Sequence, residues 1–365
     1  MVTVLIAGGG TGGHVFPMVA VGDAVRAAQP DARVVYVGTA RGIEQRVMGE
    51  RGDDLRLLDI EPLRGGGARQ LARGAWAAAR SMFAARALVK ELAPSCVLSV
   101  GGYAGGPVSL AAKSLGVPVT LLEPNSVVGL SNKLLAPFVA RAYTAFPEVE
   151  KAFAKRVVVR AGVPLRRSFE PAPHARRSGA LAVLVLGGSL GAKALNEVVP
   201  RAIADAVAAR VDLRVVHQTG KDRDVETRAR YAELGLGDRA EVAPFIDDVP
   251  AALAAADVVI ARSGASSCAE LCAIGRASVL VPFPFAVDDH QYKNARSLEA
   301  AGAAIVIRQS DATPARVAAE LAKFGADPAL AERMGERARA RGNPRAAALI
   351  AEDLLALARG EGEAS

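Results

Sequence analysis

The sequence has few aromatic residues, few cysteines and no long apolar run. Aromatic side chains make up only 4% of the 365 residues, whereas 51% of the residues are hydrophobic, so the core must consist mainly of Val, Leu, Ile and Ala. Such cores are typical of helices packed on parallel strands. No apolar run reaches the roughly 18 residues of a membrane-spanning helix, so any membrane contact is expected to be peripheral. A chain of this length suits two domains.

The chain has three cysteines, which is an odd number: Cys96, Cys268 and Cys272. Met1 leads directly into a predicted strand, so we expect no signal peptide and a reducing, cytoplasmic compartment. Cys268 and Cys272 stand four residues apart on a predicted helix without a nearby histidine. This spacing favours small buried hydrophobes over a metal site.

Acidic residues are outnumbered by basic ones. The formal net charge is +7 and the sequence pI is about 9.5. Such a balance suits phosphate-bearing ligands, nucleic acid or an anionic membrane surface, and does not choose among them.

The first segment, MVTVLIAGGGTGGHVFP, combines an apolar run with a glycine-rich turn and the start of a helix. Val2 to Ala7 predicts a strand buried on both faces of a parallel sheet. The glycines that follow allow positive φ angles and a close approach of backbone to ligand. A helix predicted from about Val15 to Ala28 presents unpaired N–H groups and the positive end of its dipole. The segment therefore predicts a phosphate site.

A dinucleotide site is the first alternative to test. Gly8, Gly10 and Gly13 match its glycine spacing, but that fingerprint also requires an acidic residue at the end of the second strand. The second predicted strand, Arg33 to Val37, is followed by glycine and threonine instead. The glycine turn therefore still predicts phosphate or diphosphate binding, whereas the missing acidic residue disfavours an NAD-dependent enzyme.

Strand, glycine turn and helix recur along the chain and predict two similar α/β halves separated by a linker at 162–173. The further strands are predicted at 55–60, 96–100, 117–122, 181–186, 213–217, 240–243, 257–261, 277–281 and 303–307. The last helix is predicted at 345–359. Ligands gather at the carboxyl ends of parallel strands, so the turns after these strands are expected to face one cleft. There, Asn125 and Asn132 suit either sugar hydroxyls or ordinary turn contacts.

A long helix is predicted from Ala68 to Leu92. One face forms an apolar stripe, and another carries Arg69, Arg73, Trp76, Arg80 and Phe83. That second face suits either solvent or the interface of a membrane.

The stretch 256–284, ADVVIARSGASSCAELCAIGRASVLVPFP, is the most informative part of the second half. Small residues from Ser263 to Ser267 lead from a strand into a helix whose N-terminus could bind a diphosphate. Glu270, expected within about the first turn, could accept hydrogen bonds from two ribose hydroxyls or merely complement the helix dipole. Asp288 to Gln291 are expected to face the same cleft.

Six motifs stand in order between about Val2 and Ile350, namely GGGTGGHVFP, GGYAGGP, GGSLGA, FIDDV, RSGASSCAE and DDHQYKNA. Together they resemble the MurG family of transferases. The resemblance implies a GT-B fold, an α/β architecture of two Rossmann-like doubly wound domains that face each other across a cleft. The first domain would comprise 1–163 with the returning helix 343–359, and the second 164–342. The implied reaction is inverting transfer of N-acetylglucosamine from UDP-GlcNAc to the 4-hydroxyl of the muramyl sugar of lipid I, giving lipid II in peptidoglycan synthesis.

The resemblance also implies substrate-binding positions, which fall on Thr11, Gly12, Gly13, Asn125, Arg166, Ser189, Ile246, Ala265, Ser266, Ser267, Cys268, Ala269, Glu270 and Gln291. By this similarity Glu270 takes the ribose, Ile246 lies beside the uracil and Gln291 meets the sugar. The chain departs from the family at two places. Leu122-Glu123-Pro124-Asn125 stands where the family usually has His-Glu-Gln-Asn, and His290 replaces one of two glutamines.

His14 is the candidate catalytic base, because an imidazole ordinarily titrates near neutral pH. Two alternatives remain: His14 donates a hydrogen bond to the acceptor diphosphate, or Glu123 is the base. No Asp-x-Asp motif stands in a plausible donor site. We therefore expect no cofactor and no tightly bound metal, with helix N-termini stabilising the leaving diphosphate.

The resemblance further implies a peripheral protein on the cytoplasmic face of the bacterial inner membrane. Its expected partners are UDP-GlcNAc, lipid I and, through the helix 68–92, an anionic membrane surface; cell-wall synthesis proteins are candidates, and nucleic acid is not expected. Two rival functions are a GT-B transferase with a soluble acceptor and a non-catalytic scaffold. The intact glycines, Glu270 and Gln291 argue against the scaffold.

Overall fold

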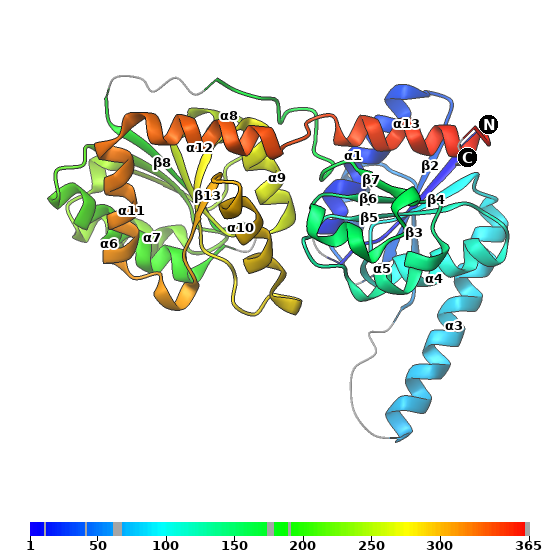
Figure 1. Cartoon of the computed structure of the whole chain (residues 1–365). Coiled ribbons are helices and arrows are strands. Elements are labelled where there is room, and N and C mark those ends of the chain that lie inside the picture. Colours follow the sequence, from blue (N-terminus) through cyan, green and yellow to red (C-terminus); the bar gives the residue numbers. More distant parts are fainter. Residues whose placement is uncertain (11, 41, 61–67, 174–178, 189–190, 362–365) are drawn as a thin grey trace. The chain divides into compact units, whose positions relative to one another are not determined.

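The computed structural model describes residues 1–10, 12–40, 42–60, 68–173, 179–188 and 191–361, and for residues 68–78 the backbone alone (Figure 1). The chain divides into two compact units. Unit 1 comprises Met1–Arg166 with Arg345–Ser365, and unit 2 comprises Arg167–Pro344. Each unit is an α/β layer structure built on a parallel sheet.

The described part of unit 1 contains a seven-stranded parallel sheet in the order β3-β2-β1-β4-β5-β6-β7. Its strands are β1 (Thr3–Ala7), β2 (Arg33–Thr39), β3 (Leu55–Leu58), β4 (Cys96–Ser99), β5 (Val119–Glu123), β6 (Arg141–Thr144) and β7 (Val158–Arg160). Its helices are α1 (Gly12–Ala28), α2 (Glu44–Arg51), α3 (Ala68–Leu92), α4 (Gly102–Ser114), α5 (Leu130–Leu135), η1 (Ala136–Phe138), η2 (Pro147–Ala152), η3 (Lys155–Val157) and α13 (Ala346–Ala358). Strand order reverses between β1 and β4, as in doubly wound sheets.

The side chains of β1 alternate between two apolar layers. Val4 and Ile6 pack with residues of α1 and α13, whereas Leu5 and Ala7 pack with residues of α3 and α4. This division follows from the two-residue period of a strand. All four side chains are fully buried, because helices cover both faces of the sheet, as the uninterrupted apolar run predicts.

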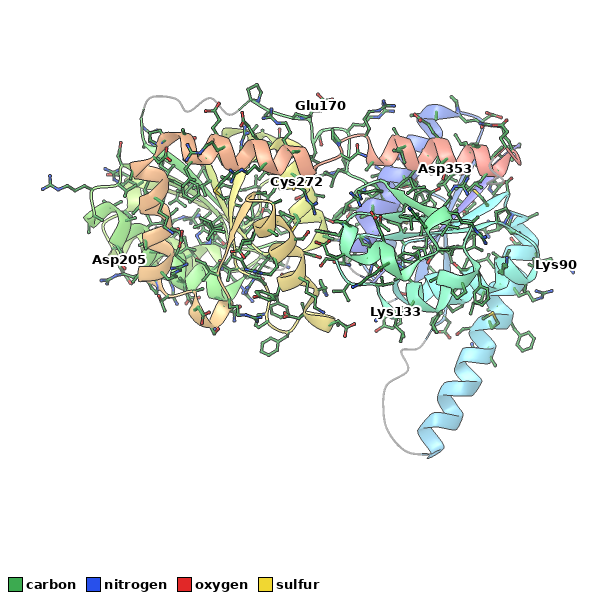
Figure 2. All side chains as sticks on the ribbon, in the orientation of Figure 1. Lys90, Lys133, Glu170, Asp205, Cys272 and Asp353 are labelled. Carbon is green, nitrogen blue, oxygen red and sulfur yellow. The ribbon has the colours of Figure 1, made fainter. Side chains whose placement is uncertain are left out.

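The last helix, α13, is attached to unit 1 by polar contacts as well as apolar packing. Asp353 (Figure 2) accepts a hydrogen bond from the Tyr143 hydroxyl at 2.7 Å and pairs with the Arg141 guanidinium at 3.3 Å. The Cys96 thiol lies 3.5 Å from the Leu354 carbonyl oxygen, to which it donates. Burial, reinforced by the charge of Asp353, raises the pKa of Tyr143, so this hydroxyl remains a donor to the carboxylate.

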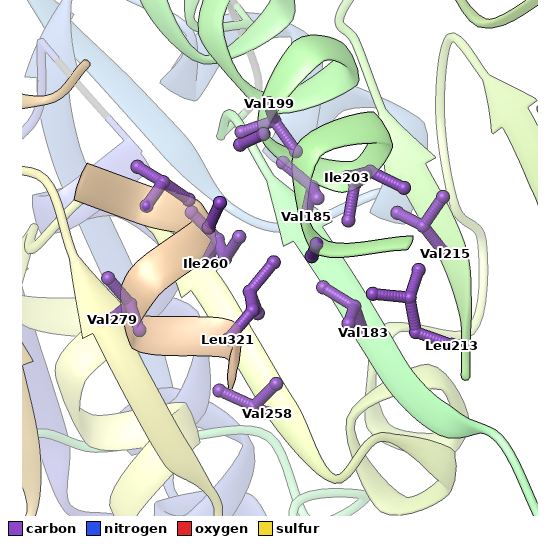
Figure 3. Packing of buried hydrophobic residues seen from close by; sticks show 14 of the residues in the cluster. Val183, Val185, Val199, Ile203, Leu213, Val215, Val258, Ile260, Val279 and Leu321 are labelled. Carbon is purple, nitrogen blue, oxygen red and sulfur yellow. The ribbon is translucent and has the colours of Figure 1, made fainter. Parts of the chain in front are cut away.

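The described part of unit 2 contains a six-stranded parallel sheet in the order β10-β9-β8-β11-β12-β13. Its strands are β8 (Leu181–Leu186), β9 (Leu213–Gln218), β10 (Ala240–Ala243), β11 (Val258–Ala261), β12 (Ala277–Leu280) and β13 (Ala304–Val306). Its helices are α6 (Lys193–Ala208), α7 (Asp224–Glu233), η4 (Gly237–Arg239), α8 (Val249–Ala255), α9 (Ala265–Ile274), η5 (Val287–Asp289), α10 (His290–Ala300), η6 (Gln309–Asp311), α11 (Pro314–Ala326) and α12 (Pro328–Arg341). Figure 3 shows Val183, Val185, Val258 and Ile260 of the central strands packing against Ile203 and Leu321 of α6 and α11.

The strands predicted from apolar runs are confirmed to within a few residues, but the structure adds two others. β6 and β7 lie between residues 123 and 162, where the sequence analysis predicts no strand. Both are short, and β6 begins and β7 ends with an arginine, so neither has a long apolar run. A second difference concerns α1, which begins at Gly12 rather than near Val15. His14 therefore lies in the first turn of a helix and not in the loop before it.

No helix in the described parts of the chain is long and apolar enough to cross a membrane.

Candidate functional site

Each sheet has one point at which strand order reverses. Four predicted site residues follow other strands, namely Asn125, Arg166, Ile246 and Gln291 after β5, β7, β10 and β12, but the remaining ones follow one of the two strands beside this point. In unit 1 these strands are β1 and β4, and in unit 2 they are β8 and β11. Ligands of open α/β sheets bind outside the carboxyl ends of the strands at such a point. This edge is therefore a candidate site in each unit; we call it the half-site of that unit and describe each one by itself.

In unit 1 the two glycine turns pack directly against each other. A Cβ atom at Gly102 would lie 2.6 Å from the Gly9 carbonyl oxygen, and one at Gly8 would lie 3.3 Å from the Gly101 carbonyl oxygen. Gly101 and Gly102 also have positive φ angles of 87° and 74°. Backbone contact of this kind requires glycine, so the turn after β1 and the turn after β4 form one surface.

His14 projects from the first turn of α1 toward the second of these turns. It is half-buried, and its Nε2 atom would lie 3.6 Å from a Cβ atom built on Gly101. Gly12 and Gly13 precede it in the same turn, where backbone N–H groups have no partner within the helix. The structure thus brings Gly12, Gly13 and His14 together. Thr11, predicted beside them, lies outside the described residues.

Glu123, the alternative base, is surrounded by backbone donors of its own loop and by a side-chain donor of α5. It is only 2% exposed, and its carboxylate accepts from the N–H groups of Asn125 and Gly129 at 3.1 and 2.9 Å and from the Asn132 side chain at 3.0 Å. Burial raises its pKa, although these hydrogen bonds oppose the shift. The carboxylate therefore holds the loop that carries Asn125. Asn132, in α5, also donates to the Leu122 carbonyl oxygen at 3.0 Å, so its amide NH₂ is used within the protein.

In unit 2 a buried glutamine joins the glycine turn after β8 to the loop after β10. Gln218 donates to the Gly188 carbonyl oxygen at 3.2 Å and accepts from the Ile246 N–H at 3.3 Å. The N–H of Ile246 is thus used within the protein. Gln218 was not among the predicted residues, since nothing in its sequence context distinguishes it from a strand end. Ser189 lies outside the described residues.

Helix α9 begins in open space. Its N-cap, Gly264, has an ordinary φ of −61° and no atom within 4 Å of an added Cβ, so neither backbone strain nor packing requires glycine there. Ser266 in the first turn has a buried hydroxyl with no hydrogen-bond partner among the described residues. These features leave room for a ligand at the unpaired N–H groups of α9.

Glu270 is the sixth residue of α9 and so lies early in the second turn, just beyond the first turn in or near which the sequence places it. Helix-dipole effects fall off within the first turn, so the dipole interpretation of Glu270 loses its support. Ala265 and Cys268 are buried, whereas Ser267, Ala269 and Glu270 are half-buried. Burial raises the pKa of Cys268 well above its usual range and that of Cys272 to about 12, which fits the predicted small hydrophobes.

Gln291, in the first turn of α10, is fixed at its amide oxygen. This oxygen accepts from the Phe283 N–H at 3.0 Å, so the amide NH₂ is directed elsewhere. Its carbonyl oxygen accepts from the Ser263 hydroxyl at 2.9 Å, which ties α10 to the start of α9. The preceding residues Asp288 and Asp289 have φ angles of 53° and 54°, and such strained backbone concentrates at functional sites.

Two further positions that the resemblance singles out are Arg166 and His290, of which His290 is the residue before Gln291 in α10. Arg166 is exposed and is the last residue of the first segment of unit 1. His290, which replaces a family glutamine, is half-buried, and its Nδ1 atom lies 2.8 Å from the Val287 carbonyl oxygen. The described residues contain no cluster of three or more His, Cys, Asp or Glu side chains that could hold a metal ion.

A buried polar chain supports the glycine turn of unit 2. His217 Nδ1 lies 3.0 Å from the Tyr231 hydroxyl and its Nε2 lies 3.1 Å from Asn196 Oδ1. The Asn196 NH₂ donates to the Thr219 carbonyl oxygen at 3.0 Å, and a Cβ atom on Gly191 would overlap that oxygen. Since Asn196 Oδ1 can only accept, the network is satisfied by a neutral imidazole protonated at Nε2.

The protonation state of His217 predicts that the folded protein loses stability in acid. Burial lowers its pKa to about 3, whereas an unfolded histidine titrates near 6.5. Below pH 6.5 His217 therefore binds a proton in the unfolded chain, but in the folded chain it stays neutral down to about pH 3. The free energy of unfolding consequently falls as the pH falls. At pH 5 this loss is about 2 kcal/mol. Calorimetric melting of the protein and of His217→Gln at pH 7 and at pH 5 measures this loss. The variant should lose less stability than the parent between pH 7 and pH 5. An equal loss in both proteins would refute the assignment of a neutral, buried His217.

Comparisons with known proteins agree with this geometry. Residues 4–144 match the model of the glycosyltransferase family 28 N-terminal domain, and residues 182–350 match that of the family 28 C-terminal domain. A protein of Sorangium cellulosum named UDP-N-acetylglucosamine--N-acetylmuramyl-(pentapeptide) pyrophosphoryl-undecaprenol N-acetylglucosamine transferase is 65% identical over 361 residues, which cover 98% of this chain and 89% of the relative.

Solved structures point the same way. The crystal structure of Acinetobacter baumannii MurG superposes with a TM-score of 0.83 at 32% identity and covers 97% of this chain and 99% of its own. The calicheamicin glycosyltransferase CalG4 superposes with a TM-score of 0.64 at 19% identity, covering 97% and 98%, which shows the fold alone. The fold and these relatives therefore define a glycosyltransferase of the GT-B class. The chain belongs to glycosyltransferase family 28, and within it to the MurG family that its motifs resemble.

Proposed function

We propose that this protein transfers N-acetylglucosamine from UDP-GlcNAc to the 4-hydroxyl of the muramyl sugar of lipid I, giving lipid II. The observation that carries the proposal is the 65% identity, over almost the whole chain, to a relative named for this transfer. The half-site of unit 2 supports it, because α9 offers unpaired N–H groups to a diphosphate and Glu270 and Gln291 offer an acceptor and an amide to ribose and sugar.

In the proposed reaction the 4-hydroxyl oxygen attacks the anomeric carbon, and the bond from that carbon to UDP breaks. UDP leaves with the bonding electron pair, and the N-terminus of α9 stabilises its charge. His14 takes the proton of the 4-hydroxyl, so the imidazole must be neutral before the step. Glu123 is the weaker candidate for this role, because its carboxylate is buried and already accepts three hydrogen bonds, two from its own loop and one from Asn132 of α5.

The direct test is to incubate the protein with UDP-GlcNAc and a lipid I analogue and to measure the product by mass spectrometry. We expect the acceptor to gain one N-acetylhexosamine and UDP to be released. Transfer to a soluble sugar acceptor but not to lipid I would favour the rival GT-B function. Binding of UDP-GlcNAc without transfer to either acceptor would favour a scaffold.

We further propose that unit 1 contacts the cytoplasmic face of an anionic bacterial membrane through α3, because the lipid acceptor is anchored there. Phe83 is 76% exposed, and the Arg80 side chain is 62% exposed while its guanidinium pairs with Asp59 at 3.4 Å, so an aromatic ring and an ion-paired cation both reach the surface of this helix. The side chains of Arg69, Arg73 and Trp76 lie outside the described ones. A basic residue near an anionic surface contributes about 1 kcal/mol, and shallow burial of aromatic rings adds to it.

Charge and insertion can be separated by mutation. Replacing Arg69, Arg73 and Arg80 with glutamine should abolish sedimentation with anionic vesicles and make any residual binding insensitive to salt. Trp76→Ala should weaken binding but preserve its salt dependence. If the arginine variant sediments like the parent, α3 is a solvated helix, and the exposed Leu130 and Leu134 of α5 become the next surface to test.

A further inference from the structure

A fully buried carboxylate, Glu44, lies behind the glycine turn of unit 1. It is the first residue of α2 and is 0% exposed. Its Oε2 atom accepts from the Gly10 N–H at 3.0 Å, and its Oε1 atom accepts from the N–H and the hydroxyl of Thr39 at 2.8 and 3.1 Å. One side chain thus joins the turn after β1 to the end of β2.

Three glycines make room for this carboxylate. A Cβ atom on Gly9, Gly38 or Gly42 would overlap the Glu44 side chain. A side chain at any of these positions would therefore displace the carboxylate from its donors. Glycines that resemble a ligand cradle in the sequence serve here to admit a carboxylate of the protein itself.

The contact also changes which donors a ligand can use. The Gly10 N–H already donates to Glu44. A phosphate at Gly10 would therefore find this donor occupied and would lie beside the Glu44 carboxylate, which would repel it. The N–H groups of Gly12 and Gly13, in the first turn of α1, have no acceptor within the helix. Glu44 thereby directs an anion away from the turn and toward the helix N-terminus.

We propose that Glu44 is a positioning residue for the transfer reaction. By holding Gly9 and Gly10, whose φ angles are 130° and 96°, it sets where α1 starts and hence where His14 lies before substrate binds. Gly102 packs on the Gly9 carbonyl and Gly101 lies beside His14, so the restraint extends to the turn after β4. The inference rests on the proposed function of His14 and of the unit 1 half-site in acceptor chemistry.

Glu44→Gln tests this selectively. The amide keeps one acceptor oxygen and gains an NH₂ group. Two Thr39 donors reach Oε1 and a single donor reaches Oε2, so the oxygen should remain at Thr39 and the NH₂ group should face the Gly10 N–H. The Gly10 N–H and the new NH₂ group would then face each other without an acceptor, so the hydrogen bond that holds the turn would be lost. We expect kcat with lipid I to fall about 10- to 100-fold, as for small displacements of a catalytic group, with a raised KM for lipid I and an unchanged Kd for UDP-GlcNAc.

The matched control is Glu320→Gln in unit 2. Glu320 is also a buried carboxylate, 1% exposed, and it pairs with Arg316 and Lys323 at 3.0 and 2.7 Å. This variant should lose stability but keep kcat and both substrate constants. If Glu44→Gln loses activity only in proportion to its folded fraction, with KM for lipid I unchanged, the carboxylate is merely structural and the proposal is wrong.

Hydrogen exchange separates this inference from the proposed function. In Glu44→Gln the amides from Gly9 to Val15 should exchange faster than in the parent, while the amides of unit 2 should not change, whatever reaction the parent catalyses. Unchanged exchange in Gly9 to Val15 would refute the restraint. If Glu44→Gln does not fold, Thr39→Val removes only the hydroxyl bond to Oε1 and should shift exchange and kcat in the same direction by a smaller factor; no shift in either would also refute the restraint.

Discussion

His14→Ala is expected to lower turnover with lipid I by about a hundredfold or more while leaving the affinity for UDP-GlcNAc little changed. General-base catalysis contributes this much because the proton of the attacking hydroxyl must leave in the transition state. His14 stands in the first turn of α1, half-buried beside Gly101, and belongs to unit 1, whereas α9 and Glu270 belong to unit 2. Steady-state kinetics with lipid I, together with calorimetric titration of UDP-GlcNAc, measures both quantities.

His14→Asn separates the base from the alternative function of His14 as a donor to the acceptor diphosphate. An asparagine NH₂ group still donates a hydrogen bond but cannot take a proton near neutral pH. If His14 is the base, Asn should be as inactive as Ala, and the acidic limb of the kcat/KM profile should disappear in both. Restored turnover in His14→Asn, or a loss confined to the KM for lipid I, would instead favour the diphosphate contact.

Glu270→Gln is expected to raise the Kd for UDP-GlcNAc about 10- to 100-fold. The amide cannot accept from two ribose hydroxyls as a carboxylate does, and a hydrogen bond to a charged group contributes about 1.5–3 kcal/mol. Because Glu270 lies in the second turn of α9, loss of a helix-dipole interaction should add little to this effect. Calorimetric titration with UDP-GlcNAc and with UDP gives the measurement.

Glu226→Gln provides the matched control for Glu270. Glu226 lies in the first turn of α7 in the same unit, and its side chain is 73% exposed, so it is a carboxylate that does complement a helix dipole. Its replacement should leave nucleotide affinity at the parent value. Donor affinity that is equally unchanged in Glu270→Gln would remove Glu270 from the binding site.

Several features of the fold could be predicted because they depend on local pattern. Apolar runs such as Val2 to Ala7 and Leu181 to Leu186 became β1 and β8, since only strands buried on both faces tolerate such runs. β6 and β7 were not predicted, because β6 has four residues and β7 three, and each has an arginine at one end. Their assignment depends on the neighbouring strand, which no local pattern encodes.

The sequence by itself determined the α/β class, the glycine turns and the order of the family motifs, because strand period, backbone freedom and spacing are properties of adjacent residues. Only the tertiary structure decided which polar side chains hold those turns. Glu44 reaches Gly10 across 34 positions, and Gln218 joins Gly188 to Ile246 across 30 and 28. These contacts arise because parallel strands bring distant loops to one edge of a sheet, where a buried carboxylate or amide must find its donors from whatever backbone lies there.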